Sequence, residues 1–159
     1  MSDSWETFAA ALQEESTLLS RVAESAQALT QALVENDIEK IRTTERALDG
    51  ARQAYQSSSG KRRGMQVRGF GALGLRQVCA YAPRTLWPTL NQRVVELTTM
   101  AISLGITTNN NKALILGGMD RLMKITSAMQ KAHSDGPGTY KRRGFVPPPT
   151  NSVLVSSNA

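Results

Sequence analysis

The chain has 159 residues, of which 40% are hydrophobic and 5% aromatic, and its formal net charge is +6. One domain with a tail fits this length, and so few aromatic side chains favour a slender helical bundle over a thick core around a buried pocket. The single cysteine, Cys79, excludes an intramolecular disulfide and fits a reducing compartment.

The charge is distributed unevenly along the chain. Residues 1–49 contain ten acidic residues and four Lys or Arg, whereas residues 50–159 contain three and fifteen. Between Asp49 and Glu96 there are eight basic residues and no acidic one. Such a basic half is compatible with binding to nucleic acid or to an acidic protein surface, and equally with packing of the acidic helices against it.

The first residues, Met1 to Glu6, show neither the basic region nor the apolar region of a signal peptide. Uninterrupted apolar runs are far shorter than the roughly 20 residues that span a bilayer. We therefore expect a soluble, cytoplasmic protein.

Two amphipathic helices are expected in the first third of the chain. The first is predicted at about residues 4–34, where apolar side chains recur at steps of three and four. Asn36 and Glu39 have the spacing of a capping box, which predicts a second helix at 37–56. Its apolar seam becomes polar, so fraying is expected past Tyr55. The short connection predicts an antiparallel hairpin.

Residues 57–86 form a variable middle that is basic and rich in glycine. The run from Ser57 to Gly64 predicts a flexible loop. The stretch Gly69-Phe70-Gly71-Ala72-Leu73-Gly74 matches the dinucleotide-binding fingerprint, which requires a strand before it and a βαβ unit around it. Because two helices precede this stretch, we interpret its glycines as a flexible or turning segment.

A long helix is predicted at 88–132, and the Gly136-Pro137-Gly138 tripeptide is expected to close it. Thr108 and Asn111 interrupt its apolar seam, and a buried Asn at such a position often fixes register. The seam residues are Leu90, Val94, Leu97, Ala101, Leu104, Thr108, Asn111, Ile115, Gly118, Leu122, Ile125, Met129 and Ala132.

Together these elements predict an all-α fold. Residues 1–133 are expected to form an elongated antiparallel helical bundle or coiled coil with a long C-terminal helix, and residues 134–159 a flexible, disordered tail. With His133 as its only histidine and one cysteine, the chain lacks the ligands of a typical metal site and a convincing Cys–His nucleophile pair. We find no catalytic constellation, and we predict no enzymatic activity, cofactor, metal or small-molecule substrate.

Two surface features leave alternatives open. The runs Lys61-Arg62-Arg63 and Lys141-Arg142-Arg143 can contact phosphates, but a solvated surface is the simpler interpretation, and nucleic acid is not the favoured partner. Met119, Met123 and Met129 extend the apolar surface beyond the seam of the long helix. They either add core contacts with the first two helices or form an adaptable groove for a partner helix.

The order of elements resembles that of the FlgN family of flagellar export chaperones: two antiparallel helices, a variable middle, a tryptophan, one long helix and a loose tail. In the long helix, the family pattern Asn-x-x-Asn-Gly-x-Leu-Ile is matched at Asn111, Leu114 and Ile115. Thr108 and Lys112 depart from that pattern.

The resemblance implies a chaperone that binds the C-terminal segments of hook-associated, filament-junction proteins. It would keep these clients unassembled and deliver them to the type III export apparatus. The stretch from Tyr140 to Gly144 is similar to the family's Tyr-x-x-x-Gly, which implies that Tyr140 and Gly144 help to dock on the export gate. The implied client-binding residues are Asn111, Leu114, Ile115, Met119, Leu122, Met123 and Ile125.

Two other functions stay open. A basic helical protein that binds nucleic acid would lose affinity steeply as salt is added. A structural coiled-coil subunit would form a homodimer through its long seam, and loss of that dimer on polarising Leu97 or Leu104 would favour this function.

Overall fold

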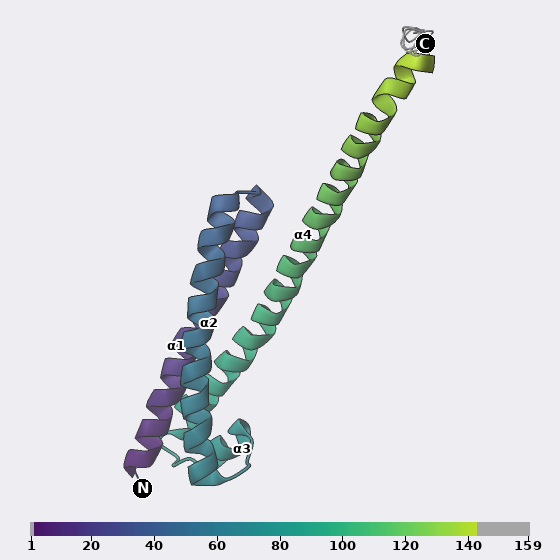
Figure 1. Ribbon diagram of the computed structural model, residues 1–159. Coiled ribbons are helices and arrows are strands. Elements are labelled where there is room, and N and C mark those ends of the chain that lie inside the picture. The colour runs from purple at the N-terminus through teal and green to yellow at the C-terminus, as the bar shows by residue number, and fades with distance from the viewer. Residues whose placement is uncertain (1, 143–159) are drawn as a thin grey trace, which may run out of the picture. The chain divides into compact units, whose positions relative to one another are not determined.

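The computed structural model describes residues 2–142, with side chains described for residues 4–134. Within this range the all-α prediction, with a long C-terminal helix, is confirmed. The chain divides into two units between Ile115 and Leu116, here called unit 1 and unit 2, so α4 contributes to both. The helices are α1 (Ser2–Glu35), α2 (Ile38–Phe70), α3 (Leu75–Ala80) and α4 (Trp87–Arg142) (Figure 1).

In unit 1, α1 and α2 form an antiparallel hairpin (Figure 1). Asn36 adopts the left-handed conformation with φ of 55°, and the amides of Asn36 and Asp37 donate to carbonyls in the last turn of α1, both at 3.2 Å. This is the Schellman arrangement. The Asp37 carboxylate then caps α2 by accepting from the Lys40 amide at 3.0 Å. The predicted cap at Asn36 was wrong by one residue, because asparagine tolerates the left-handed turn itself.

Two apolar clusters hold unit 1 together. The half-buried side chains of Tyr55 and Leu104 belong to both clusters, so the core is continuous along α1. Each large apolar side chain that is fully buried contributes about 1.5–3 kcal/mol of hydrophobic stabilisation. The buried members of the first cluster are Trp5, Phe8, Leu12, Leu19, Val78, Cys79, Leu90, Val94 and Leu97. Those of the second are Val22, Ala26, Leu29 and Leu48.

The second half of α2 departs from the prediction. The helix continues to Phe70, so the predicted helix end at 56 and the flexible loop over 57–64 were wrong. Ser58 and Ser59 are buried, and Phe70 packs on Trp5 of α1 with ring centroids 4.8 Å apart. Contacts with α1 therefore stabilise a helix that its local composition disfavours.

A buried ion pair accounts for much of this difference. Arg62 and Glu15 are 6% and 2% exposed, and the Arg62 guanidinium donates from Nε and Nη2 to the two Glu15 carboxylate oxygens. Arg62 Nη1 also donates to Gln66 Oε1 at 2.6 Å, and Gln66 Nε2 donates to the Leu73 carbonyl at 2.5 Å. This chain of hydrogen bonds connects α1, α2 and the segment that leads into α3.

The glycine-rich stretch 69–74 ends α2 and leads into α3. Gly71 has φ of 68° and ψ of −144°, a backbone conformation that is essentially restricted to glycine. Its amide donates to the Val67 carbonyl at 3.0 Å, which closes the last turn of α2. A helix, not a strand, precedes the glycines, which agrees with their interpretation as a turn.

In the part of α4 that belongs to unit 1, two residues predicted to lie on the buried seam are exposed, and the residue before each of them is half-buried instead. Ala101 and Thr108 are exposed, whereas Met100 and Thr107 are half-buried. A straight helix has 3.6 residues per turn, so the face it presents drifts relative to a strict heptad pattern.

The end of the long helix also differs from the prediction. Instead of ending at 132, α4 runs through the Gly136-Pro137-Gly138 tripeptide to Arg142, so the predicted tail does not begin at 134. Proline removes one backbone donor, but its fixed φ lies in the helical range, so the helix can continue across it. The rest of the predicted tail, 143–159, lies outside the described residues.

We predict that Gly71→Ala lowers the free energy of unfolding by about 1–3 kcal/mol, because alanine is strained at this positive φ. Gly69 offers a matched control two residues earlier, inside α2, where an added Cβ meets nothing within 4 Å. Gly69→Ala should instead raise the free energy of unfolding by up to about 1 kcal/mol. Urea unfolding followed by circular dichroism measures both, and equal effects would contradict the assignment of the turn.

We predict that Glu15→Ala lowers the free energy of unfolding by about 3–5 kcal/mol, because it leaves the Arg62 guanidinium buried without a counter-charge. Urea unfolding measures the change. Glu39→Ala, which removes the exposed partner of Arg42, should change stability by less than about 1 kcal/mol. The double variant Glu15→Leu/Arg62→Met should recover most of the loss, and failure to recover would show that the pair is not the cause.

Candidate protein-binding surface

Asn111, which the sequence marks as a seam residue and as a client contact, lies against α1 in unit 1. It is 5% exposed, and its Nδ2 donates to the Ala26 carbonyl at 3.0 Å. The Thr30 hydroxyl donates to Asn111 Oδ1 at 2.6 Å. These contacts give the side chain a role in the register between α1 and α4.

Leu114 and Ile115 are the last apolar residues of unit 1 on α4. Both are 39% exposed, less than the apolar residues that follow them. In the sequence Leu114 and Ile115 also match the FlgN pattern around Asn111. The structure thus places the three residues of that pattern in unit 1, with one buried and two at the surface.

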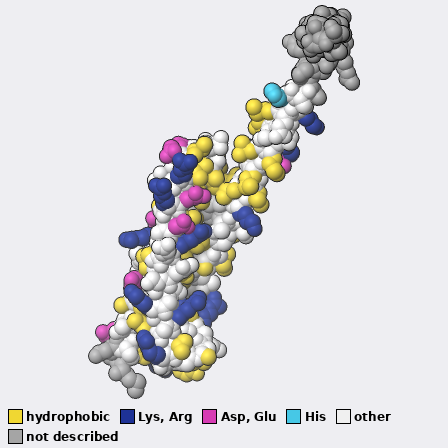
Figure 2. Space-filling model, in the orientation of Figure 1, with side chains coloured by type: hydrophobic (Ala, Val, Ile, Leu, Met, Phe, Trp, Pro, Cys, Tyr) yellow, Lys and Arg dark blue, Asp and Glu magenta, His cyan; other side chains and the backbone are white. Residues whose placement is uncertain are grey.

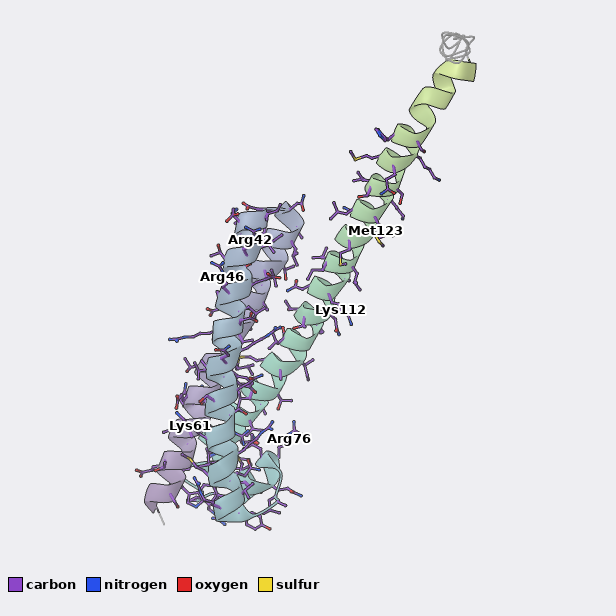
Figure 3. The ribbon with its side chains drawn as sticks, viewed as in Figure 1. Arg42, Arg46, Lys61, Arg76, Lys112 and Met123 are labelled. Atoms are coloured by element: carbon purple, nitrogen blue, oxygen red, sulfur yellow. The ribbon has the colours of Figure 1, made fainter. Side chains whose placement is uncertain are left out.

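Unit 2 carries an exposed apolar surface, called here the unit 2 apolar face. Figure 2 shows hydrophobic side chains along this stretch of α4, and Figure 3 shows Met123 projecting from the helix. Its six large side chains are each more than half exposed, between 55% and 67%. They are Leu116, Met119, Leu122, Met123, Ile125 and Met129.

The unit 2 apolar face is broad. At about 100° per residue, its side chains cover roughly half of the helix circumference. A two-stranded coiled coil uses about two of every seven positions, whereas a helix in a bundle uses about three. Six large apolar side chains between Leu116 and Met129 match the bundle pattern. The face is therefore suited to burial among more than one helix.

The opposite side of this stretch is polar. Asp120 and Lys124 form an ion pair at 2.7 Å with spacing i, i+4, and Arg121 and Lys131 are exposed. Exposed pairs of this kind contribute less than about 1 kcal/mol, but they keep this side hydrated. The helix is thus amphipathic in unit 2, although its apolar side is uncovered.

Several predicted residues lie where the structure describes them only in part. The backbone of Tyr140 belongs to α4, but its side chain is outside the described range. Gly144 lies outside the described residues altogether.

Leu97 is buried and Leu104 half-buried in unit 1, so polarising either would disturb the core rather than test self-association.

Leu116 and Met129 belong to the unit 2 apolar face but were not among the predicted client contacts. The sequence singles out Met129, with Met119 and Met123, as a residue of a groove for a partner helix, and helical spacing also identifies Leu116. Met129 lies seven residues after Leu122, on the same side of the helix, and Leu116 lies seven before Met123.

The cysteine of the chain, Cys79, is buried in α3. Burial raises the pKa of the Cys79 thiol, and the positive charge of Arg62 opposes that shift only in part. The thiol therefore stays protonated at neutral pH, which is its unreactive form. Among the described residues, no group of three or more His, Cys, Asp or Glu is placed to hold a metal ion. None of the described helices has a stretch long and apolar enough to cross a bilayer.

A comparison with the sequence profiles of protein families identifies the family to which this chain belongs. The family profile described as FlgN protein matches residues 1–147. The chain belongs to the FlgN family. Searches of curated proteins and of solved structures gave no match.

Membership of the FlgN family confirms the resemblance and gives the chain its general role. FlgN proteins are flagellar export chaperones that bind flagellar proteins, and the family is not an enzyme family. A chaperone needs a surface that binds apolar segments, and the unit 2 apolar face has this character.

We predict that Asn111→Ala lowers the free energy of unfolding by about 1–3 kcal/mol, because it removes the buried hydrogen bonds of the Asn111 amide to the Ala26 carbonyl and the Thr30 hydroxyl. Asn110→Ala, at the neighbouring exposed position, should change it by less than about 0.5 kcal/mol. Urea unfolding measures both. If Asn111→Ala instead weakens partner binding and leaves stability unchanged, its side chain contacts the partner directly.

Proposed function

We propose that this FlgN-family chain binds the C-terminal segments of hook-associated, filament-junction proteins in the cytoplasm. It keeps these clients unassembled and delivers them to the type III export apparatus. The proposal rests on the family relationship together with one structural observation, the unit 2 apolar face.

The client contacts in this proposal begin at Leu114 and Ile115 and continue along the unit 2 apolar face. An amphipathic client segment that folds as a helix on this face buries apolar surface on both partners, at about 25 cal/mol for each Å². Three of the six face residues are methionines, whose unbranched side chains adapt to different partners. This composition suits a chaperone with more than one client.

Docking on the export gate is assigned in this proposal to Tyr140 and Gly144, on the basis of their match to the FlgN pattern. A tyrosine has an apolar ring and a hydroxyl that bonds to polar groups, which suits a protein interface. The two assignments separate the tasks of the chain: the long helix holds the client, and the residues at and beyond its end contact the export gate.

We predict that Met119→Ser/Leu122→Ser/Met123→Ser weakens the affinity for a hook-associated protein by about 100-fold or more, because three exposed apolar side chains that the client would cover are lost. Isothermal titration calorimetry with the full-length chain and a purified client measures the dissociation constant.

The matched control is Val95→Ser/Ile102→Ser/Ile106→Ser. It removes three apolar side chains from the same helix, in unit 1, that are 51%, 62% and 58% exposed. This control should bind the client with unchanged affinity. Equal losses in both variants, or no binding of any hook-associated protein by the unaltered chain, would refute the proposed function.

A further inference from the structure

The basic middle of the chain forms one end of unit 1. Figure 2 shows Lys and Arg side chains over the lower part of α2 and beside α3, whereas acidic side chains gather mainly toward the α1–α2 turn. We call this region the basic end. Its exposed cationic residues are Lys61, Arg63, Arg68, Arg76 and Arg84.

Charge at the basic end is not neutralised within unit 1. No ion pair in the described part of the chain joins any of its five cations to a carboxylate. Arg62, which lies between Lys61 and Arg63 in the sequence, differs from these five, because it forms a buried ion pair with Glu15. Glu6 and Glu14 are exposed on the neighbouring half of α1, which also contains Asp3, and three acids against five cations still leave a positive excess.

Three large apolar side chains are exposed on the same stretch of the chain, residues 61–87, that carries these cations. Val67, Tyr81 and Trp87 are 63%, 70% and 46% exposed. Tyr81 ends α3, and Trp87 begins α4. Tyrosine and tryptophan beside Lys and Arg are the combination found where proteins meet the polar layer of a membrane.

We propose that the basic end binds anionic phospholipid surfaces. The cations interact with lipid phosphates, each contributing about 1 kcal/mol near such a surface. Val67, Tyr81 and Trp87 enter the interfacial layer, where an apolar body with a polar tip is favoured. This surface lies in unit 1 and uses none of the residues of the unit 2 apolar face.

The arrangement favours a lipid surface over nucleic acid. A single strand is bound in a groove in which cations follow the backbone and aromatic rings stack on bases. A pocket at the basic end is lined by Val67, Gly71 and Leu73 among others. Two cations also line it, and one of them, Arg62, is already paired with Glu15, so Arg63 alone could contact a phosphate there. Val67 has no ring on which a base can stack.

The test is sedimentation of the full-length chain with vesicles. Vesicles of phosphatidylcholine that contain about one-third phosphatidylglycerol should bind the chain, whereas pure phosphatidylcholine vesicles should not. Raising the salt concentration should weaken binding, because the Debye length shortens from about 8 Å at physiological ionic strength to about 3 Å at 1 M.

Two triple variants with the same loss of charge locate the binding surface. Arg68→Gln/Arg76→Gln/Arg84→Gln should lower the partition coefficient by about 100-fold, at roughly fivefold for each charge. The control, Arg42→Gln/Arg46→Gln/Arg52→Gln, removes three exposed arginines from the other part of α2 and should bind nearly as well as the unaltered chain. Circular dichroism checks that both variants remain helical.

Fluorescence identifies the contact directly. The chain has two tryptophans, so Trp5→Phe leaves Trp87 as the only one. The emission of Trp87 should shift to shorter wavelength on binding to the anionic vesicles, because the exposed ring leaves water.

Tyr81→Ser should weaken binding to these vesicles without changing the net charge of the chain.

Four results would each overturn the proposal. They are equal binding to neutral vesicles, an equal loss in the control triple variant, sedimentation with no change in Trp87 emission, and binding to a single-stranded RNA but not to vesicles.

Discussion

A single buried amide sets the register between α1 and α4. Asn111 is bonded to the Ala26 carbonyl and the Thr30 hydroxyl, so sliding one helix along the other would break both contacts inside the core. An unsatisfied buried amide costs more than a misplaced apolar side chain, and only one register satisfies it. This register brings Leu104 into the second core cluster.

A second polar contact fixes the other half of unit 1. The Glu15–Arg62 pair is buried, and Gln66 extends its hydrogen bonds to the segment before α3. A buried pair of this kind contributes little net stability, because desolvation offsets the attraction, but it disfavours misaligned helices. One basic residue of the middle segment is thus part of the core, while its neighbours Lys61 and Arg63 remain exposed.

The sequence predicted those features that depend on local periodicity. Steps of three and four identify α1, the hairpin and most of α4, since a helix places such residues on one side. The second half of α2 was missed, because Ser57–Gly64 has the composition of a loop and Glu15, the partner of Arg62, lies 47 residues away. The sequence also left open whether Met119 and Met123 are core or surface residues; within unit 2 they are 56% and 64% exposed and belong to its apolar face.

Two adjacent glycines bear on the strength of the complex proposed for unit 2. Gly117 and Gly118 lie within α4, and an added Cβ at either would meet nothing within 4 Å, so close packing does not require them. Each lowers helix stability by about 1 kcal/mol relative to alanine. The described side chains from Leu116 to Ser134 are exposed, so no burial offsets this loss. Part of the interaction energy with a partner therefore goes into stabilising the helix, which makes the complex weaker than its buried area implies. A chaperone that must release its client benefits from such a reversible complex.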